Sequence, residues 1–189
     1  PVGQIAQGGM GYVIKAIDSQ TGAEVAIKCL KPNLEHSARY MARFQREARS
    51  LAAMEHPNIV RLHSVGSEPI PHIVMEYVAG WNLRRLMGSP IPGPVVMAMA
   101  RQMADALDHI HQHGLLHRDL KPENIFLINR GGSPDFVKVL DFGLAKLTQG
   151  DEKVSHKTRT GSVMGTPYYM SPEQCEGKAN IDHRADLYS

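Results

Sequence analysis

The chain has 189 residues, 42% hydrophobic and 21% charged, a composition typical of folded globular proteins rather than disordered or fibrous ones. Its 21 basic and 19 acidic residues leave a formal net charge of +2, too balanced to predict a nucleic-acid partner. Two cysteines without repeated spacing indicate a reducing compartment, and no apolar run approaches the roughly 20 residues that cross a bilayer. We therefore expect a cytoplasmic location and no membrane segment within this chain.

The first 79 residues carry mostly strand signals. β-branched and aromatic runs predict strands at 12–17 and 24–30, joined by turn residues at 19–22. Apolar positions recur with a helical period over 37–54, and His56-Pro57-Asn58 ends that helix. Two strand-like runs follow at 59–65 and 72–78. The glycine-rich loop Gly8-Gly9-Met10-Gly11 begins so early that almost no strand is expected ahead of it.

From Gly80 onward the pattern becomes mainly helical. Asn82 is expected to cap a short helix through Met87, and 88–94 is predicted to be a loop. The longest helix is predicted at 95–112, with one apolar side formed by Val96, Met99, Ala100, Met103, Ala106, Leu107 and Ile110. Short strands are expected at 125–128 and 136–140, around a loop at 129–135. A strand-rich part and a helical part joined near 76–80 predict two lobes, with a ligand cleft between them.

Two motifs in the helical part carry the chemistry. The first is His117-Arg118-Asp119-Leu120-Lys121-Pro122-Glu123-Asn124, and the second is Asp141-Phe142-Gly143, whose carboxylate follows that of Asp119 by 22 residues. Transfer of a phosphoryl group from a nucleotide needs such a set of side chains. One carboxylate must meet the incoming hydroxyl, while an amide and a second carboxylate hold Mg²⁺.

The order and spacing of these motifs resemble the catalytic loop and metal-binding motif of protein kinases. Other motifs of the family occur in the same chain order. They are the loop Gly8–Gly11 followed by Val13, with Ala6 at the first glycine position, then Val25–Lys28, Glu47, the linker Met75–Gly80 and the segment Gly165–Gln174. The resemblance covers essentially the whole chain and is nearest to the bacterial-type serine/threonine kinases.

The resemblance implies an α+β, two-lobed kinase fold, with 1–189 as a partial catalytic domain. Its N-lobe, an antiparallel sheet plus one helix, would be 1–79, and the first part of a mainly helical C-lobe would be 80–189. Asp119 would accept the proton of the substrate hydroxyl and Lys121 would stabilise the phosphoryl group in transfer. Asn124 and Asp141 would hold Mg²⁺, with Mn²⁺ as an alternative metal. The ATP site would comprise Ala6, Gly8, Gly11, Val13, Ala26, Lys28, Glu47, Glu76, Val78, Asn124, Phe126 and Asp141.

The same resemblance implies a protein substrate and a form of control. Lys121 and the segment ending at Gln174 indicate serine or threonine acceptors. Arg118 would bind a phosphate on Thr160 or, second in order, on Thr158, and self-association would serve autophosphorylation. Two alternatives are a docking module without catalysis and a kinase for small molecules. Both ends resemble cut ends, so we expect part of a longer protein, and activity of these residues alone stays open.

Overall fold

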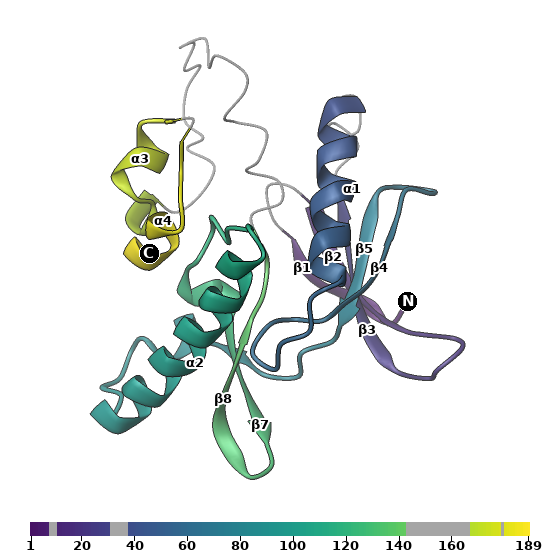
Figure 1. The fold of residues 1–189 in the computed structure, drawn as a ribbon. Helices are drawn as coiled ribbons and strands as arrows, with labels where there is room; N and C mark the ends of the chain where they lie inside the picture. The colour runs from purple at the N-terminus through teal and green to yellow at the C-terminus, as the bar shows by residue number, and fades with distance from the viewer. Residues whose placement is uncertain (8–10, 31–37, 143–166, 179) are drawn as a thin grey trace. The chain divides into compact units, whose positions relative to one another are not determined.

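The fold is built from two units, each with its own sheet and at least one helix (Figure 1). The computed structural model describes residues 1–7, 11–30, 38–142, 167–178 and 180–189, without the side chains of 38–41, 43, 47 and 167. The first unit is Pro1–Ala79 and the second is Gly80–Ser189. Among the described residues, no helix has both the length and the apolar character that a membrane-spanning helix needs.

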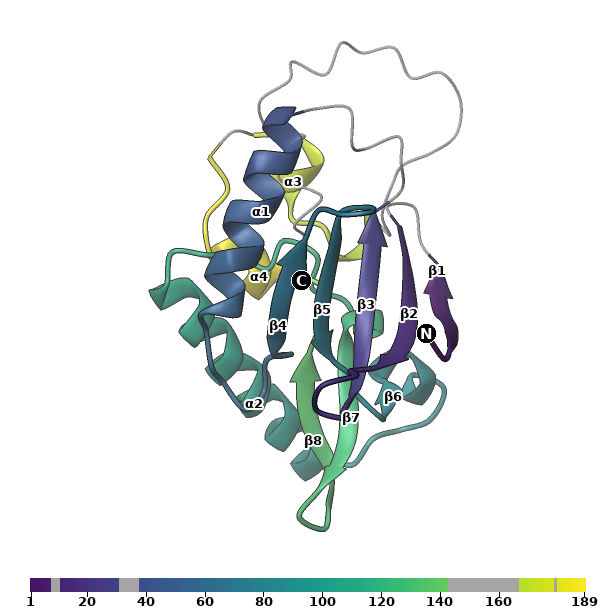
Figure 2. The same cartoon turned by 90° about the vertical axis from the view of Figure 1, so that its right-hand side faces the viewer.

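The first unit is a five-stranded antiparallel sheet with one helix. Its strands are β1 (Gly3–Gln7), β2 (Gly11–Ile17), β3 (Glu24–Leu30), β4 (Leu62–Gly66) and β5 (His72–Glu76), in the spatial order β1-β2-β3-β5-β4. The helix α1 (Ala38–Ala52) packs against β4, as Figure 2 shows. It does so because Phe44, Ala48 and Leu51, spaced at helical intervals, are buried on one face. The helix and four strands predicted here are confirmed, although β4 begins at Leu62 instead of Ile59.

The expectation of almost no strand ahead of the glycine-rich loop was wrong. β1 pairs with β2 from Gly3, opposite Lys15, to Gln7, opposite Tyr12. All five β1 residues are exposed, and their sequence, Gly-Gln-Ile-Ala-Gln, lacks the alternation of apolar and polar residues from which a strand could be predicted. β1 is a strand because it hydrogen-bonds to the edge of β2, although its side-chain pattern does not predict one.

The second unit combines a three-stranded antiparallel sheet with one long helix and several short ones. Its sheet has the order β6 (Trp81–Asn82), β7 (Ile125–Arg130), β8 (Ser133–Val139). The long helix α2 (Gly93–Gln112) packs on β8, where the Gln102 side chain donates to Asp135 O at 3.0 Å and accepts from Val137 N at 3.0 Å. The shorter helices are η2 (Leu83–Leu86), η3 (Pro122–Asn124), η5 (Pro167–Tyr169), α3 (Pro172–Cys175) and α4 (Arg184–Tyr188).

Details of this unit differ from the sequence prediction. α2 begins at Gly93, inside the predicted loop, because Pro94 suits a first helical turn, where its missing N–H leaves no bond unmade. The predicted loop at 129–135 is a tight turn at Gly131 and Gly132, whose φ values of 59° and 84° favour glycine. Val96, predicted on the apolar side of α2, is 43% exposed, since the described part of the unit does not cover the helix there.

Candidate active site

The predicted catalytic loop is organised around a buried histidine. His117 is fully buried, and its ring lies 5.0 Å from the Phe142 ring, centroid to centroid. Burial lowers the pKa of His117, so the ring is neutral near pH 7. A neutral ring has one donor and one acceptor. Nε2 lies 2.9 Å from Leu140 O, its acceptor, while Nδ1 accepts from Asp119 N at 3.3 Å. His117 therefore connects the catalytic loop to the strand that leads to Asp141, and neither ring nitrogen is left for a metal.

Asp119 stands at the centre of a charged cluster. Its Oδ2 lies 2.9 Å from Lys121 Nζ and 3.2 Å from Asn124 Nδ2, which also donates to Asp119 O at 2.8 Å. The Asp119 and Lys121 side chains are 19% and 21% exposed, so this ion pair is only partly screened by solvent. The loop thus presents a carboxylate beside an ammonium, held in place by a buried amide.

The two predicted metal-binding residues are brought together by the backbone. Leu140 N donates to Asn124 O at 2.8 Å, so Asn124 lies beside the residue that precedes Asp141. Within the described part of the chain, both hydrogen bonds of the Asn124 side chain use its amide nitrogen, which leaves Oδ1 as the oxygen able to ligate a cation. Asp141 has φ 57°, a conformation that costs a non-glycine residue about 1–2 kcal/mol. Amide and carboxylate oxygens are the hard donors that Mg²⁺ prefers, so this pair fits a magnesium ion.

Asp186, a residue to which the sequence analysis assigned no role in the site, holds the catalytic loop in position. It is 2% exposed, and its carboxylate accepts from His117 N at 2.8 Å and from Arg118 N at 2.7 Å. His111 Nε2 lies 2.9 Å from the same carboxylate. Arg118 has φ 63°, so its strained backbone is fixed by the acceptor that α4 supplies. The short helical pattern of 184–188 alone could not have revealed this, because its partners lie 68 to 75 residues away in the chain.

The start of α3 is tied to the same loop. Ser171 and Gln174 form a capping box, in which Gln174 Oε1 accepts from Ser171 N at 2.9 Å. The Gln174 amide also donates to Arg118 O at 3.0 Å. Arg118 is therefore held at its N–H by Asp186 and at its C=O by Gln174, on either side of its positive φ.

In the first unit, Gly11 is needed for a packing reason. A Cβ at this position would overlap Cys29 O, in the backbone of the neighbouring strand β3. Gly11 is buried and pairs with Leu30, so a side chain would force β2 and β3 apart. Close approach of two strands, and not only approach to a phosphate, therefore explains this glycine.

Other predicted nucleotide-site residues of this unit lie on the central strands β2, β3 and β5 and on the edge strand β1. Lys28 is half-buried on β3, opposite Val13 on one side and Ile73 on the other. Ala26 is buried opposite Met75, and Ala6 is exposed on β1 opposite Val13. Glu47 lies in α1, but its side chain is outside the described residues.

The linker Met75–Gly80, which begins in β5, is held by contacts of Glu76 and of Tyr77. Glu76 N donates to Arg61 O at 2.9 Å, and Glu76 Oε1 accepts from Arg61 N at 2.8 Å. Lys15 Nζ lies 4.1 Å from the centre of the Tyr77 ring and also pairs with Glu24. The Glu76 side chain is thus committed to the fold. Val78 follows, half-buried.

The comparison with known proteins decides the family. The family model described as "Protein kinase domain" matches residues 1–189. The chain belongs to the protein kinase family. It is 43% identical over 189 residues to the serine/threonine-protein kinase pkn3 of Myxococcus xanthus, covering 98% of this chain and 34% of that protein. It is 38% identical over 189 residues to the serine/threonine-protein kinase PknB of Mycobacterium leprae, covering 96% of this chain and 29% of that protein.

Solved structures show the same kinase fold. The crystal structure of the Mycobacterium tuberculosis PknI kinase domain matches with a TM-score of 0.75 at 29% identity, covering 99% of this chain and 68% of that one. The predicted kinase fold and bacterial serine/threonine type are therefore confirmed. This kinase chain spans about a third or less of the length of the curated relatives named above.

The structure places one further predicted residue of the kinase site. Phe126 is half-buried on β7, between Asn82 of β6 and Lys138 of β8. Gly8, Thr158 and Thr160 lie outside the described residues.

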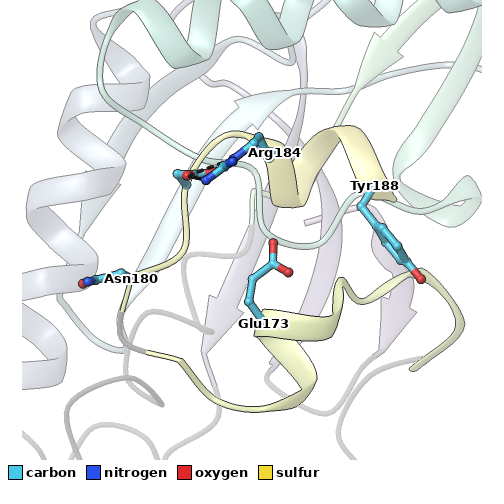
Figure 3. A pocket seen from close by; sticks show the side chains of 5 residues that line it. Glu173, Asn180, Arg184 and Tyr188 are labelled. Carbon is cyan, nitrogen blue, oxygen red and sulfur yellow. Dashed lines mark hydrogen bonds and ion pairs between the residues drawn. The ribbon is translucent and has the colours of Figure 1, made fainter.

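A pocket in the second unit is separate from this site. It is lined by Glu173, Asn180, Asp182, Arg184 and Tyr188, as Figure 3 shows. Arg184 pairs with Asp182 at 2.7 Å and lowers the pKa of that carboxyl to about 2. No residue of the catalytic loop lines this pocket, so it does not mark the place of catalysis.

Proposed function

We propose that this kinase domain transfers the γ-phosphate of ATP to serine or threonine hydroxyls of proteins. The observation that carries the proposal is the Asp119 cluster, in which one carboxylate oxygen lies within 3.2 Å of both Lys121 Nζ and Asn124 Nδ2. Protein kinases use ATP and a divalent metal in general, and the named relatives are serine/threonine kinases. Self-association for autophosphorylation and a cytoplasmic location, compatible with the two free thiols, belong to the same proposal.

The roles follow from the chemistry of the side chains. Asp119 orients the substrate hydroxyl and takes its proton as the oxygen bonds to the γ-phosphorus, while ADP leaves. Lys121 supplies a positive charge beside the phosphoryl oxygens, where negative charge is spread during transfer. Asn124 and Asp141 would hold the metal, which neutralises phosphate charge when bound. Lys28 would contact the nucleotide phosphates, aligned by Glu47, and the backbone at Glu76 and Val78 would hold the adenine ring.

We further propose control by phosphorylation at Thr160, or second at Thr158. Arg118 supports this, because its backbone is fixed by Asp186 and Gln174 and its side chain is a natural phosphate ligand. A phosphate bound to the Arg118 side chain would restrain Arg118, the residue directly before Asp119. Identification of the phosphorylated residues by mass spectrometry, with Thr160→Ala and Thr158→Ala compared, tests this part.

The main test uses the full-length protein with labelled ATP, Mg²⁺ and casein as a protein substrate. Asp141→Ala and Lys28→Ala should abolish transfer while circular dichroism stays unchanged. Asp119→Asn should lower kcat by about 10² to 10⁴, the usual contribution of a general base. Asp108→Ala, an exposed residue of α2 that contacts Gln112, is the matched control and should keep full activity. Label on casein serine or threonine that persists in Asp141→Ala would refute the proposal.

A further inference from the structure

An exposed aromatic and basic surface lies at the start of the second unit. It consists of Trp81 on β6 and of Arg84 and Arg85 on η2, here called the arginine–tryptophan surface. Trp81 is 61% exposed, and the Arg85 guanidinium lies 3.7 Å from the centre of its ring. Tryptophan and arginine are the residue types most enriched among binding hot spots, so their stacking in solvent indicates a surface made for contact.

The backbone below this surface is firmly placed. Trp81 pairs with Leu127 of β7, and Asn82 Oδ1 caps η2 by accepting from Arg85 N at 3.2 Å. Gly80 lies so close to β7 that a Cβ would overlap Leu127 O. Because strand pairing and a side-chain helix cap fix its backbone, the surface is ordered before any partner arrives, which lowers the entropic cost of binding.

The surface lies beside the catalytic loop. η2 packs on η3, and Arg84 Nε lies 3.8 Å from Glu123 Oε1. Glu123 is the neighbour of Asn124, whose amide contacts Asp119. A substrate in extended form advances roughly 3.3 Å per residue. Side chains a few positions away from a serine at Asp119 therefore come within reach of these arginines.

The charge of the surface is positive. Its two guanidinium groups outnumber the one carboxylate beside it, that of Glu123, and the Arg84–Glu123 contact is long and partly exposed, with 58% and 38% of the side chains accessible. With two positive groups and one negative group, the surface keeps a net positive charge, and the exposed pair adds little stability. The contact with the Trp81 ring does not occupy the N–H donors of the Arg85 guanidinium, so these can donate to a carboxylate.

We propose that the arginine–tryptophan surface binds an acidic segment of the protein substrate, close to the residue that is phosphorylated. The inference rests on the proposed function, because it names the substrate class of that same site. A basic segment attracted by Glu123 is the opposite preference, and the experiment distinguishes the two.

The test compares two peptides with the full-length protein. Both carry one serine, flanked by Asp and Glu in one peptide and by Lys and Arg in the other, and kcat/KM is measured for each. We expect the acidic peptide to be preferred by about tenfold, as two exposed ion pairs would give. Arg84→Glu/Arg85→Glu should invert the preference. Arg130→Glu is the matched control, since Arg130 stacks on Phe136 in the same unit, 4.7 Å from the ring centre, but at the β7–β8 turn. It should keep the wild-type preference.

The ratio of the two rates separates recognition from damage. A loosened fold lowers both rates together, so an unchanged ratio in the reversal variant would overturn the inference, and so would a wild-type preference for the basic peptide. If the reversal variant does not fold, Arg84→Gln/Arg85→Gln replaces it, and the ratio should then shrink towards one. Absence of transfer to casein and to both peptides would instead overturn the proposed function itself.

Discussion

Replacement of Asp186 tests how the catalytic loop is held. Asp186→Ala removes the acceptor of two backbone N–H groups, those of His117 and Arg118, and the partner of His111 Nε2. Each N–H left without an acceptor costs about 1–3 kcal/mol, so the two together cost about 2–6 kcal/mol. Native domains have a total stability of about 5–15 kcal/mol, so the change is large but need not unfold the chain.

The loss should extend to catalysis. Without Asp186, the backbone of Arg118 at φ 63° can relax, and it carries the adjacent Asp119 with it. A displacement near 1 Å at a catalytic group can lower the rate by about 10². We expect kcat to fall by that factor while KM for ATP changes little, because the hydrogen-bond partners of the Asp186 side chain among the described residues are all in the second unit. Asp186→Asn, which keeps one acceptor oxygen, should show smaller losses of stability and rate.

The assay combines urea denaturation with steady-state phosphorylation of casein by the full-length protein. Asp108→Ala is the control, since Asp108 is exposed and surface changes usually stay within about 0.5 kcal/mol. The reasoning is refuted if Asp186→Ala keeps both its free energy of unfolding and its kcat. A fall in stability with an unchanged kcat would show that the loop geometry does not depend on this carboxylate.

Two further predictions concern stability. Gly11→Ala should lower the free energy of unfolding, measured by urea denaturation, by about 1–3 kcal/mol, because the new Cβ meets Cys29 O. Gly3→Ala is the control and should have a much smaller effect, because the space around Gly3 is open. Equal losses in the two variants would contradict this explanation. The second concerns His117, whose pKa is lowered in the folded protein, so that the unfolded chain binds the proton first as the pH falls. The contribution of His117 to the free energy of unfolding is therefore full above the ordinary pKa of 6.5 and decreases as the pH drops below it. The decrease is at most about 1.4 kcal/mol per pH unit. His117→Gln should reduce that slope, as unfolding measured at pH 7.5, 6.5 and 5.5 would show, and an identical slope in the two proteins would argue against it.

Predictions that depend on a few neighbouring residues agree with the structure. The turn at 19–22, the apolar face of α1 and the Asn82 cap of η2 each depend on contacts between residues close in the chain. The residues and order of the catalytic motifs could likewise be identified from the sequence, since a short loop carries Asp119, Lys121 and Asn124 together. β1 was missed because its pairing involves residues without an apolar pattern.

The residue types and spacing of the catalytic loop were thus determined by the sequence alone, because those groups lie within a few residues of one another. Only the tertiary structure decided what holds them. The acceptor for Arg118 N lies 68 residues further along, the neighbour that requires Gly11 to be glycine is on another strand, and Arg84 meets Glu123 through two short helices. The physical reason is that a carboxylate or a glycine does not encode its distant partner, which is set by the packing of the whole unit.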